Sequence, residues 1–255
     1  MSEAVATADE LLLRLRRFHS DYFPLHLQRF QDLVAGGQHP KTLFIGCSDS
    51  RVVPYLLTGT GPGELFIVRN VGAFIPPYDG YLTDPHDAMD ARASTRPAGA
   101  DSPRQLVGLH GTTAAIEFAV LSLHVERIIV CGHSHCGAIQ AAYEGVPEEA
   151  VALRAWLQLA REALLPVQSS PEALRRTEQR VVVLQLERLM GYPMVRREVE
   201  KGKLTLHGWH YVIEDGEVHV FDVKQGNFVP AAIASNSGTG PYQPYVEHDG
   251  QIFSS

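Results

Sequence analysis

The chain has 255 residues, 45% of them hydrophobic and 20% charged, as in ordinary soluble globular proteins. A formal net charge of −7 argues against nucleic acid or an anionic membrane as the main partner. The three cysteines, an odd number, do not form a disulfide framework and favour a reducing compartment. The first ten residues lack the features of a signal peptide, and no apolar run approaches the roughly 20 residues that span a bilayer. We therefore expect a cytoplasmic protein.

The first elements expected are helices and two strands. Apolar residues recur at roughly helical spacing over residues 10–33, and Pro24 divides this stretch into two helices. Apolar runs at 42–46 and 64–70 predict strands. Residues 78–109 carry several Pro, Asp and Gly residues without periodicity, which predicts a long surface loop or insertion.

The second half of the chain predicts further helices and strands. Residues 112–123 form a helix that Thr112 or Thr113 caps, followed by a strand at 128–131. Helices dominate residues 147–190, with a break near 166–171. A hairpin follows at 204–213 and 217–223, around Asp215 and Gly216, and the residues after Gly226 look irregular. This order predicts one α/β domain over residues 1–255, with a mostly parallel sheet flanked by helices.

Sulfur and imidazole groups stand at the ends of two expected strands. Cys47 follows the first strand, and His133 and Cys136 follow a later one in a His-x-x-Cys motif. A parallel sheet gathers such strand ends in one crevice. Two thiolates and an imidazole suit Zn²⁺ and leave a fourth position open, as in catalytic zinc sites. Taken alone, a cysteine at a strand end is more often a small buried apolar residue than a ligand.

Asp49 and Arg51 lie close behind Cys47, and we expect them on the same side of an extended segment. In one interpretation they form a structural ion pair. Beside a zinc-bound hydroxide, Asp49 would instead accept its proton and orient the oxygen, while Arg51 keeps the carboxylate ionised. A third arrangement stays open, in which Asp49 ligates the zinc itself and displaces the water.

Three runs resemble signatures of the β-class carbonic anhydrases: CSDSR at 47–51, GELFIVRN at 63–70 and GHSHCG at 132–137. The resemblance extends through 111–120 and 206–209 and covers the chain from about residue 18 to residue 223. By position it implies zinc held by Cys47, His133 and Cys136. Asp49 and Arg51 match the catalytic dyad of the class.

The resemblance implies reversible hydration of carbon dioxide to bicarbonate and a proton, through attack by zinc-hydroxide. His135 matches no ligand position, the backbone of Gly137 would lie beside the substrate, and Phe118 would form an apolar pocket wall. N-terminal helices would pack on a partner subunit, which gives dimers that pair into tetramers. The likeness to bacterial and cyanobacterial forms leaves a carboxysomal location and association with carboxysome components open.

Two other functions remain open from the sequence. A carbonyl sulfide or carbon disulfide hydrolase on the same scaffold would present the same zinc site. A zinc-holding scaffold subunit of a bacterial microcompartment is the other, although Asp49 and Arg51 argue against a purely structural role.

Overall fold

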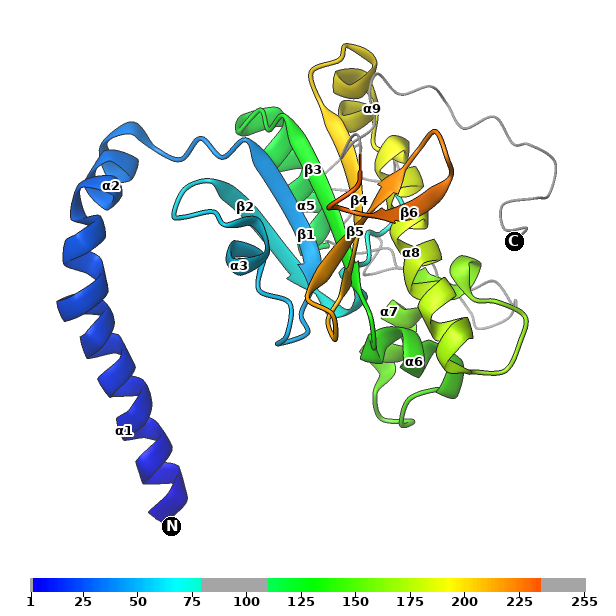
Figure 1. The fold of residues 1–255 in the computed structure, drawn as a ribbon, viewed down its shortest axis with the longest axis horizontal. Helices are drawn as coiled ribbons and strands as arrows, with labels where there is room; N and C mark the ends of the chain where they lie inside the picture. The colour runs from blue at the N-terminus through cyan, green and yellow to red at the C-terminus, as the bar shows by residue number, and fades with distance from the viewer. Residues whose placement is uncertain (1, 79–109, 235–255) are drawn as a thin grey trace, which may run out of the picture.

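A six-stranded sheet forms the centre of the computed structural model, which describes residues 2–78 and 110–234 (Figure 1). The sheet has the order β2-β1-β3-β4-β5-β6. Strands β2, β1, β3 and β4 are parallel, and β5 and β6 continue the sheet antiparallel. The α/β class and the mostly parallel sheet are therefore confirmed. The strands are β1 (Thr42–Cys47), β2 (Leu65–Asn70), β3 (Arg127–His133), β4 (Thr205–Val212), β5 (Glu217–Asp222) and β6 (Asn227–Pro230).

The last strand corrects one prediction, because the residues after Gly226 are not all irregular. In β6, Val229 pairs with Val220 of β5, and Phe228 packs on Phe221 with ring centroids 5.3 Å apart. A strand of four residues is too short to show a clear alternation of polar and apolar residues. The sheet edge and the aromatic contact stabilise it instead. The predicted insertion, apart from Tyr78, lies outside the described residues.

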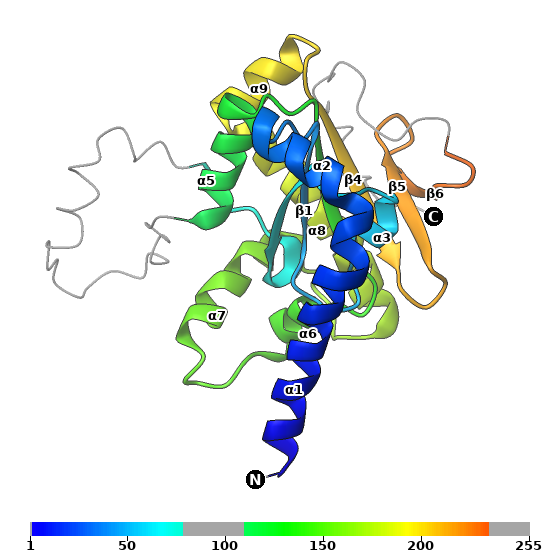
Figure 2. The same cartoon turned by 90° about the vertical axis from the view of Figure 1, so that its left-hand side faces the viewer.

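Two N-terminal helices, α1 (Ser2–Arg17) and α2 (Phe23–Gly36), are joined by a π-helical turn, η1 (Phe18–Tyr22). Pro24 lies in the first turn of α2, where its missing N–H costs no helical hydrogen bond. Figure 1 shows both helices set apart from the part of the chain that holds the sheet, and in Figure 2, which looks from their side, they lie in front of it. Most of their apolar side chains are exposed, Leu15 by 65% and Leu25 by 81%, whereas three in α2 are half-buried: Phe23, Phe30 and Leu33. The expected helical pattern is present, but its apolar residues are not buried within this chain.

The remaining helices flank the sheet, and none of the helices in the described ranges is long and apolar enough to cross a membrane. The predicted threonine cap is wrong: His110 is the N-cap of α5, and the Thr112 hydroxyl instead accepts a hydrogen bond from Asn70 at 3.1 Å. These helices are α3 (Pro54–Thr58), η2 (Val71–Ala73), α5 (Gly111–Glu117), η3 (Phe118–Ser122), α6 (Gly137–Glu144), α7 (Val151–Leu157), η4 (Gln158–Ala163), α8 (Pro171–Gly191) and α9 (Pro193–Glu200).

The long helix α8 packs directly on β3 and β4, and two glycines permit this close approach. A Cβ atom on Gly132 would lie 2.6 Å from Cγ2 of Val182, and one on Gly208 would lie 3.0 Å from Cγ1 of the same residue. Val182 is only 1% exposed and belongs to the main core cluster. One turn before it on α8, Glu178 therefore comes to lie beneath the carboxyl end of β3.

Candidate metal centre

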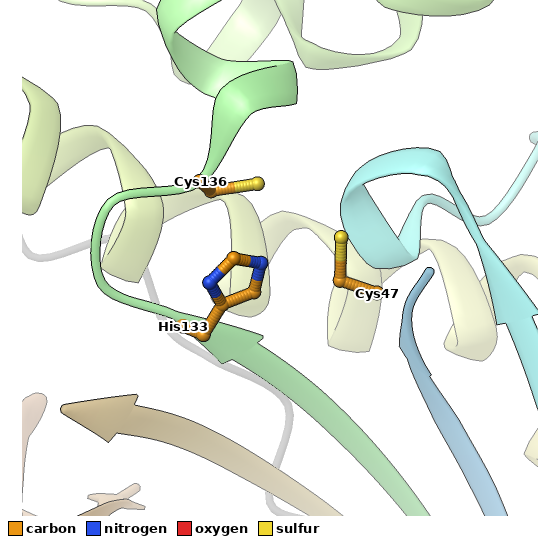
Figure 3. A group of neighbouring side chains, drawn as sticks. All are labelled: Cys47, His133 and Cys136. Carbon is orange, nitrogen blue, oxygen red and sulfur yellow. The ribbon is translucent and has the colours of Figure 1, made fainter. Parts of the chain in front are cut away.

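Three side chains that could hold a metal ion meet at the carboxyl ends of β1 and β3. The ligand atoms of Cys47, His133 and Cys136 all lie within 4.8 Å of one another, and all three residues are buried. Cys47 is the last residue of β1, His133 is the last residue of β3, and Cys136 directly precedes α6. Figure 3 shows the three side chains directed toward a common point. The parallel register of β1 and β3 brings these distant residues together, as the sequence predicts.

His133 is oriented as a metal-ligating histidine. The ring is buried, and its Nδ1 donates to the main-chain oxygen of Ser134 at 2.8 Å. This hydrogen bond keeps a proton on Nδ1, so the ring would bind a metal through Nε2. Within the described residues, Nε2 of His133 has no hydrogen-bond partner. A buried nitrogen without a partner is costly, and a metal ion among the three ligand atoms would satisfy it.

The two cysteines of this group differ in how readily they lose a proton. The hydrogen bond from Cys136 lowers the pKa of Cys47 to about 4, although burial opposes the shift. The same hydrogen bond, together with burial, raises the pKa of Cys136. The Cys47 sulfur also accepts the main-chain N–H groups of Asp49 and Gly72, both at 3.4 Å. A divalent cation would balance the charge of both thiolates, so the donor set fits zinc.

Asp49 and Arg51 form a two-pronged ion pair beside this group. Arg51 donates from Nε to Oδ1 at 2.9 Å and from Nη2 to Oδ2 at 2.7 Å. These hydrogen bonds hold the pKa of Asp49 well below its usual range. Oδ2 of Asp49 lies 3.9 Å from Nε2 of His133. The expectation of an extended segment was wrong: Val52 N–H bonds to the Asp49 carbonyl at 3.0 Å, so a turn brings the pair together.

His135 contributes its main chain to this arrangement, while its ring points elsewhere. Its φ of 55° lies in the left-handed region, and its carbonyl accepts a hydrogen bond from Nη2 of Arg51 at 3.0 Å. The side chain is 67% exposed and lies 3.4 Å from a carboxylate oxygen of Glu214. The ring of His135 therefore faces Glu214, whereas that of His133 faces the sulfurs.

Two further residues hold the site, and the sequence reasoning assigned neither of them a part in it. Arg69 of β2 donates to the carbonyls of Cys47 at 3.1 Å and Asp49 at 2.6 Å, which fixes the turn after β1. Glu178 of α8 accepts the N–H of Cys136 at 3.1 Å. Arg69 lies in the GELFIVRN run, so a signal existed. No local pattern marks Glu178, since its contact depends on how α8 packs.

The two expected pocket residues lie in different places. Gly137 begins α6 immediately after Cys136, and a Cβ atom added to it would meet no atom within 4 Å. Open space therefore adjoins the metal group at this position. Phe118 begins η3, is 45% exposed, and packs on Phe66 of β2 with ring centroids 5.7 Å apart.

Comparison with known proteins agrees with this geometry. Residues 42–218 match the carbonic anhydrase family. A carbonic anhydrase of Synechococcus elongatus is 38% identical over 217 residues, covering 82% of this chain and 70% of that protein. One of Pseudomonas aeruginosa is 39% identical over 223 residues, covering 85% and 88%. The solved structure of the β-carbonic anhydrase CcaA has a TM-score of 0.76 at 32% identity and covers 91% of this chain and 95% of that one.

A parallel sheet that delivers two cysteines and a histidine to one buried point defines a zinc enzyme of the α/β class. With the sequence and structural matches, the chain belongs to the carbonic anhydrase family and, within it, to the β class. The cofactor of this class is zinc, and its reaction is the reversible hydration of carbon dioxide.

Proposed function

We propose that in this carbonate dehydratase Cys47, His133 and Cys136 hold the zinc, and Asp49 and Arg51 form the catalytic pair. The observation that carries the proposal is the unpartnered Nε2 of His133, buried between two sulfurs and 3.9 Å from the Asp49 carboxylate. Three protein ligands leave a fourth position for water or substrate, as catalytic zinc requires.

When bound, zinc lowers the pKa of a water to about 7, a known effect in carbonic anhydrases. Asp49 accepts a hydrogen bond from the attacking oxygen and so directs a lone pair at the carbon of carbon dioxide. Arg51 engages both Asp49 oxygens, which keeps the carboxylate ionised and prevents it from turning. A new C–O bond forms as one C=O bond opens, so carbon dioxide and water give bicarbonate and a proton.

We propose Gly137 and Phe118 as residues of the substrate pocket. The absence of a side chain at Gly137 leaves space beside Cys136 for a small substrate. Phe118 offers an exposed aromatic ring that suits carbon dioxide, a molecule without a permanent dipole. Both assignments rest on the resemblance of the surrounding motifs to the family.

We further propose that the chain forms dimers through its N-terminal helices, which pack on a partner subunit, and that dimers pair into tetramers. The exposed leucines of α1 and α2 support this, because an apolar surface of this kind marks an interaction site. A solved structure from the tetrameric β-carbonic anhydrases of Sordaria macrospora shares the fold, with a TM-score of 0.58 at 26% identity.

The location of the protein and its extent as one domain are also proposals. We propose that the enzyme is cytoplasmic. We also propose residues 1–255 as a single domain, because strands from residue 42 to residue 230 join one sheet. Association with carboxysome components rests only on the cyanobacterial relatives. The similar proteins named above are all carbonic anhydrases. They give no support to a carbonyl sulfide or carbon disulfide hydrolase, or to a scaffold subunit.

The test combines metal analysis with stopped-flow hydration of carbon dioxide. The wild type should carry one zinc per chain and turn over rapidly, and Cys136→Ser should lose both properties. Cys131→Ala is the matched control, because Cys131 is fully buried in a separate cluster with Phe44 and Ile129. It should retain zinc and activity. Full zinc occupancy without hydration, together with turnover of carbonyl sulfide, would overturn the proposal.

A further inference from the structure

A buried acidic side chain lies directly beneath one of the proposed zinc ligands. Glu178 of α8 is 4% exposed, and its Oε1 accepts the main-chain N–H of Cys136 at 3.1 Å. Its Oε2 lies 3.3 Å from Nε2 of His210, a residue of β4 with no exposed surface. One carboxylate therefore connects the loop that carries the metal group to both α8 and β4.

The surroundings of this carboxylate leave it little contact with solvent. A cavity of about 10 Å³ adjoins it and is lined by Glu178, His133 and Cys136, with Gly132 and other apolar neighbours. This volume accommodates at most about one water molecule. Burial of a carboxylate is unfavourable unless hydrogen bonds or a nearby charge compensate it. Here the N–H of Cys136 and the imidazole of His210 are the protein groups that compensate the burial of Glu178.

The hydrogen bond acts at the point where the chain changes direction. Cys136 is the N-cap of α6, with φ −72° and ψ 113°, and His135 just before it has a φ of 55°. A residue in the left-handed region is held there by its surroundings. Earlier in the same loop, the Ser134 hydroxyl accepts the N–H of Ile213 at 2.9 Å. Among these contacts, the one from Glu178 holds a proposed zinc ligand itself.

We infer that Glu178 is a positioning residue for zinc: by holding the main chain of Cys136, it fixes the direction of that thiolate and slows the release of the metal. This inference rests on the proposed ligand set. Outer hydrogen bonds of this kind contribute about 10-fold to 100-fold to metal affinity in other zinc proteins. The carboxylate contributes in a second way, since its negative charge lies next to the proposed site of a divalent cation.

A matched residue on the same helix separates positioning from general stability. Gln185 is fully buried on α8, and its side-chain oxygen accepts the main-chain N–H of Ile75 at 2.7 Å. Ile75 is distant in sequence from the loop that carries His133 and Cys136. Glu178→Ala and Gln185→Ala therefore each remove one buried acceptor of a backbone hydrogen bond. Both variants should lower the midpoint of thermal unfolding.

Zinc release distinguishes the two variants. Holoenzyme is challenged with excess EDTA, and the zinc that remains bound is followed by atomic absorption. Glu178→Ala should release zinc about 10-fold to 100-fold faster than the wild type, and Gln185→Ala should release it at about the wild-type rate. Equal acceleration in both variants, or none in Glu178→Ala, would overturn the inference.

A nearly isosteric variant covers the case in which Glu178→Ala fails to fold. Glu178→Gln keeps the shape and an acceptor oxygen but loses the charge, and a neutral acceptor forms a weaker hydrogen bond. It should release zinc at least about threefold faster than the wild type, and an unchanged rate would contradict the inference. If the wild type itself carries no zinc, the proposed function fails. If the wild type holds zinc and the variants match it, only the role of Glu178 fails.

Discussion

Gly132→Ala tests whether the close packing of α8 on β3 supports the metal centre. The added Cβ atom would lie 2.6 Å from Cγ2 of Val182, whereas nonbonded carbon atoms prefer about 3.5–4.0 Å. Val182 is 1% exposed in the middle of α8, and β3 has a neighbouring strand on each side. The two neighbouring strands hold β3 in the sheet, so α8 must shift away from the sheet by about 1 Å.

Such overpacking typically costs about 1–3 kcal/mol of unfolding free energy. In a chain of this size, each kcal/mol lowers the melting temperature by about 2–4 °C, so we expect a fall of roughly 2–12 °C. The shift of α8 also carries Glu178 away from Cys136. Zinc should therefore leave Gly132→Ala faster than it leaves the wild type.

The assay is thermal unfolding of the zinc-loaded protein at one fixed protein concentration, with zinc release to EDTA measured on the same samples. Gly191→Ala is the control, because a Cβ atom at this end of α8 would meet no atom within 4 Å, and it should melt at or slightly above the wild-type temperature. Gly132→Ala with Val182→Ala should be less destabilised than the sum of the single changes, since the clash is gone. A wild-type melting temperature for Gly132→Ala, or strict additivity, would refute the reasoning.

Three further predictions address the site and the surface. Asp49→Ala should keep its zinc but lose about 10²-fold to 10⁴-fold in kcat, measured by stopped-flow hydration, and normal turnover would exclude the proposed role. Zinc uptake by the metal-free protein at pH 6 should release about two protons, from Cys136 and His133, because Cys47 with a pKa of about 4 has already lost its own. Calorimetry in buffers of different ionisation enthalpy measures this number, and three protons would contradict an already ionised Cys47. Leu25→Glu, at a side chain that is 81% exposed, should reduce the mass measured by light scattering if α2 packs on a partner, and an unchanged oligomer would exclude that contact.

Local patterns were sufficient to predict most of the fold and the metal group. Apolar runs and breaks placed the strands of the parallel sheet, and parallel strands necessarily bring their carboxyl ends to one edge. Cys47 and His133 end two parallel strands that the structure places side by side, so the two residues meet at one edge of the sheet. The failures occurred where the local signal was weak or ambiguous: the four-residue strand β6, and Thr112, whose hydroxyl bonds to Asn70 instead of capping its helix.

The chemistry of this protein can be derived from the amino-acid sequence, because the identity and spacing of the donor atoms are properties of the chain. The sequence supplied two thiolates, an imidazole and a carboxylate–guanidinium pair at predictable strand ends. What holds these groups in place depends on contacts between distant elements. The contact between Glu178 and Cys136 joins residues 42 positions apart and exists because α8 lies against β3 at Gly132. Such a contact depends on the relative placement of two elements, which no periodicity within either one encodes.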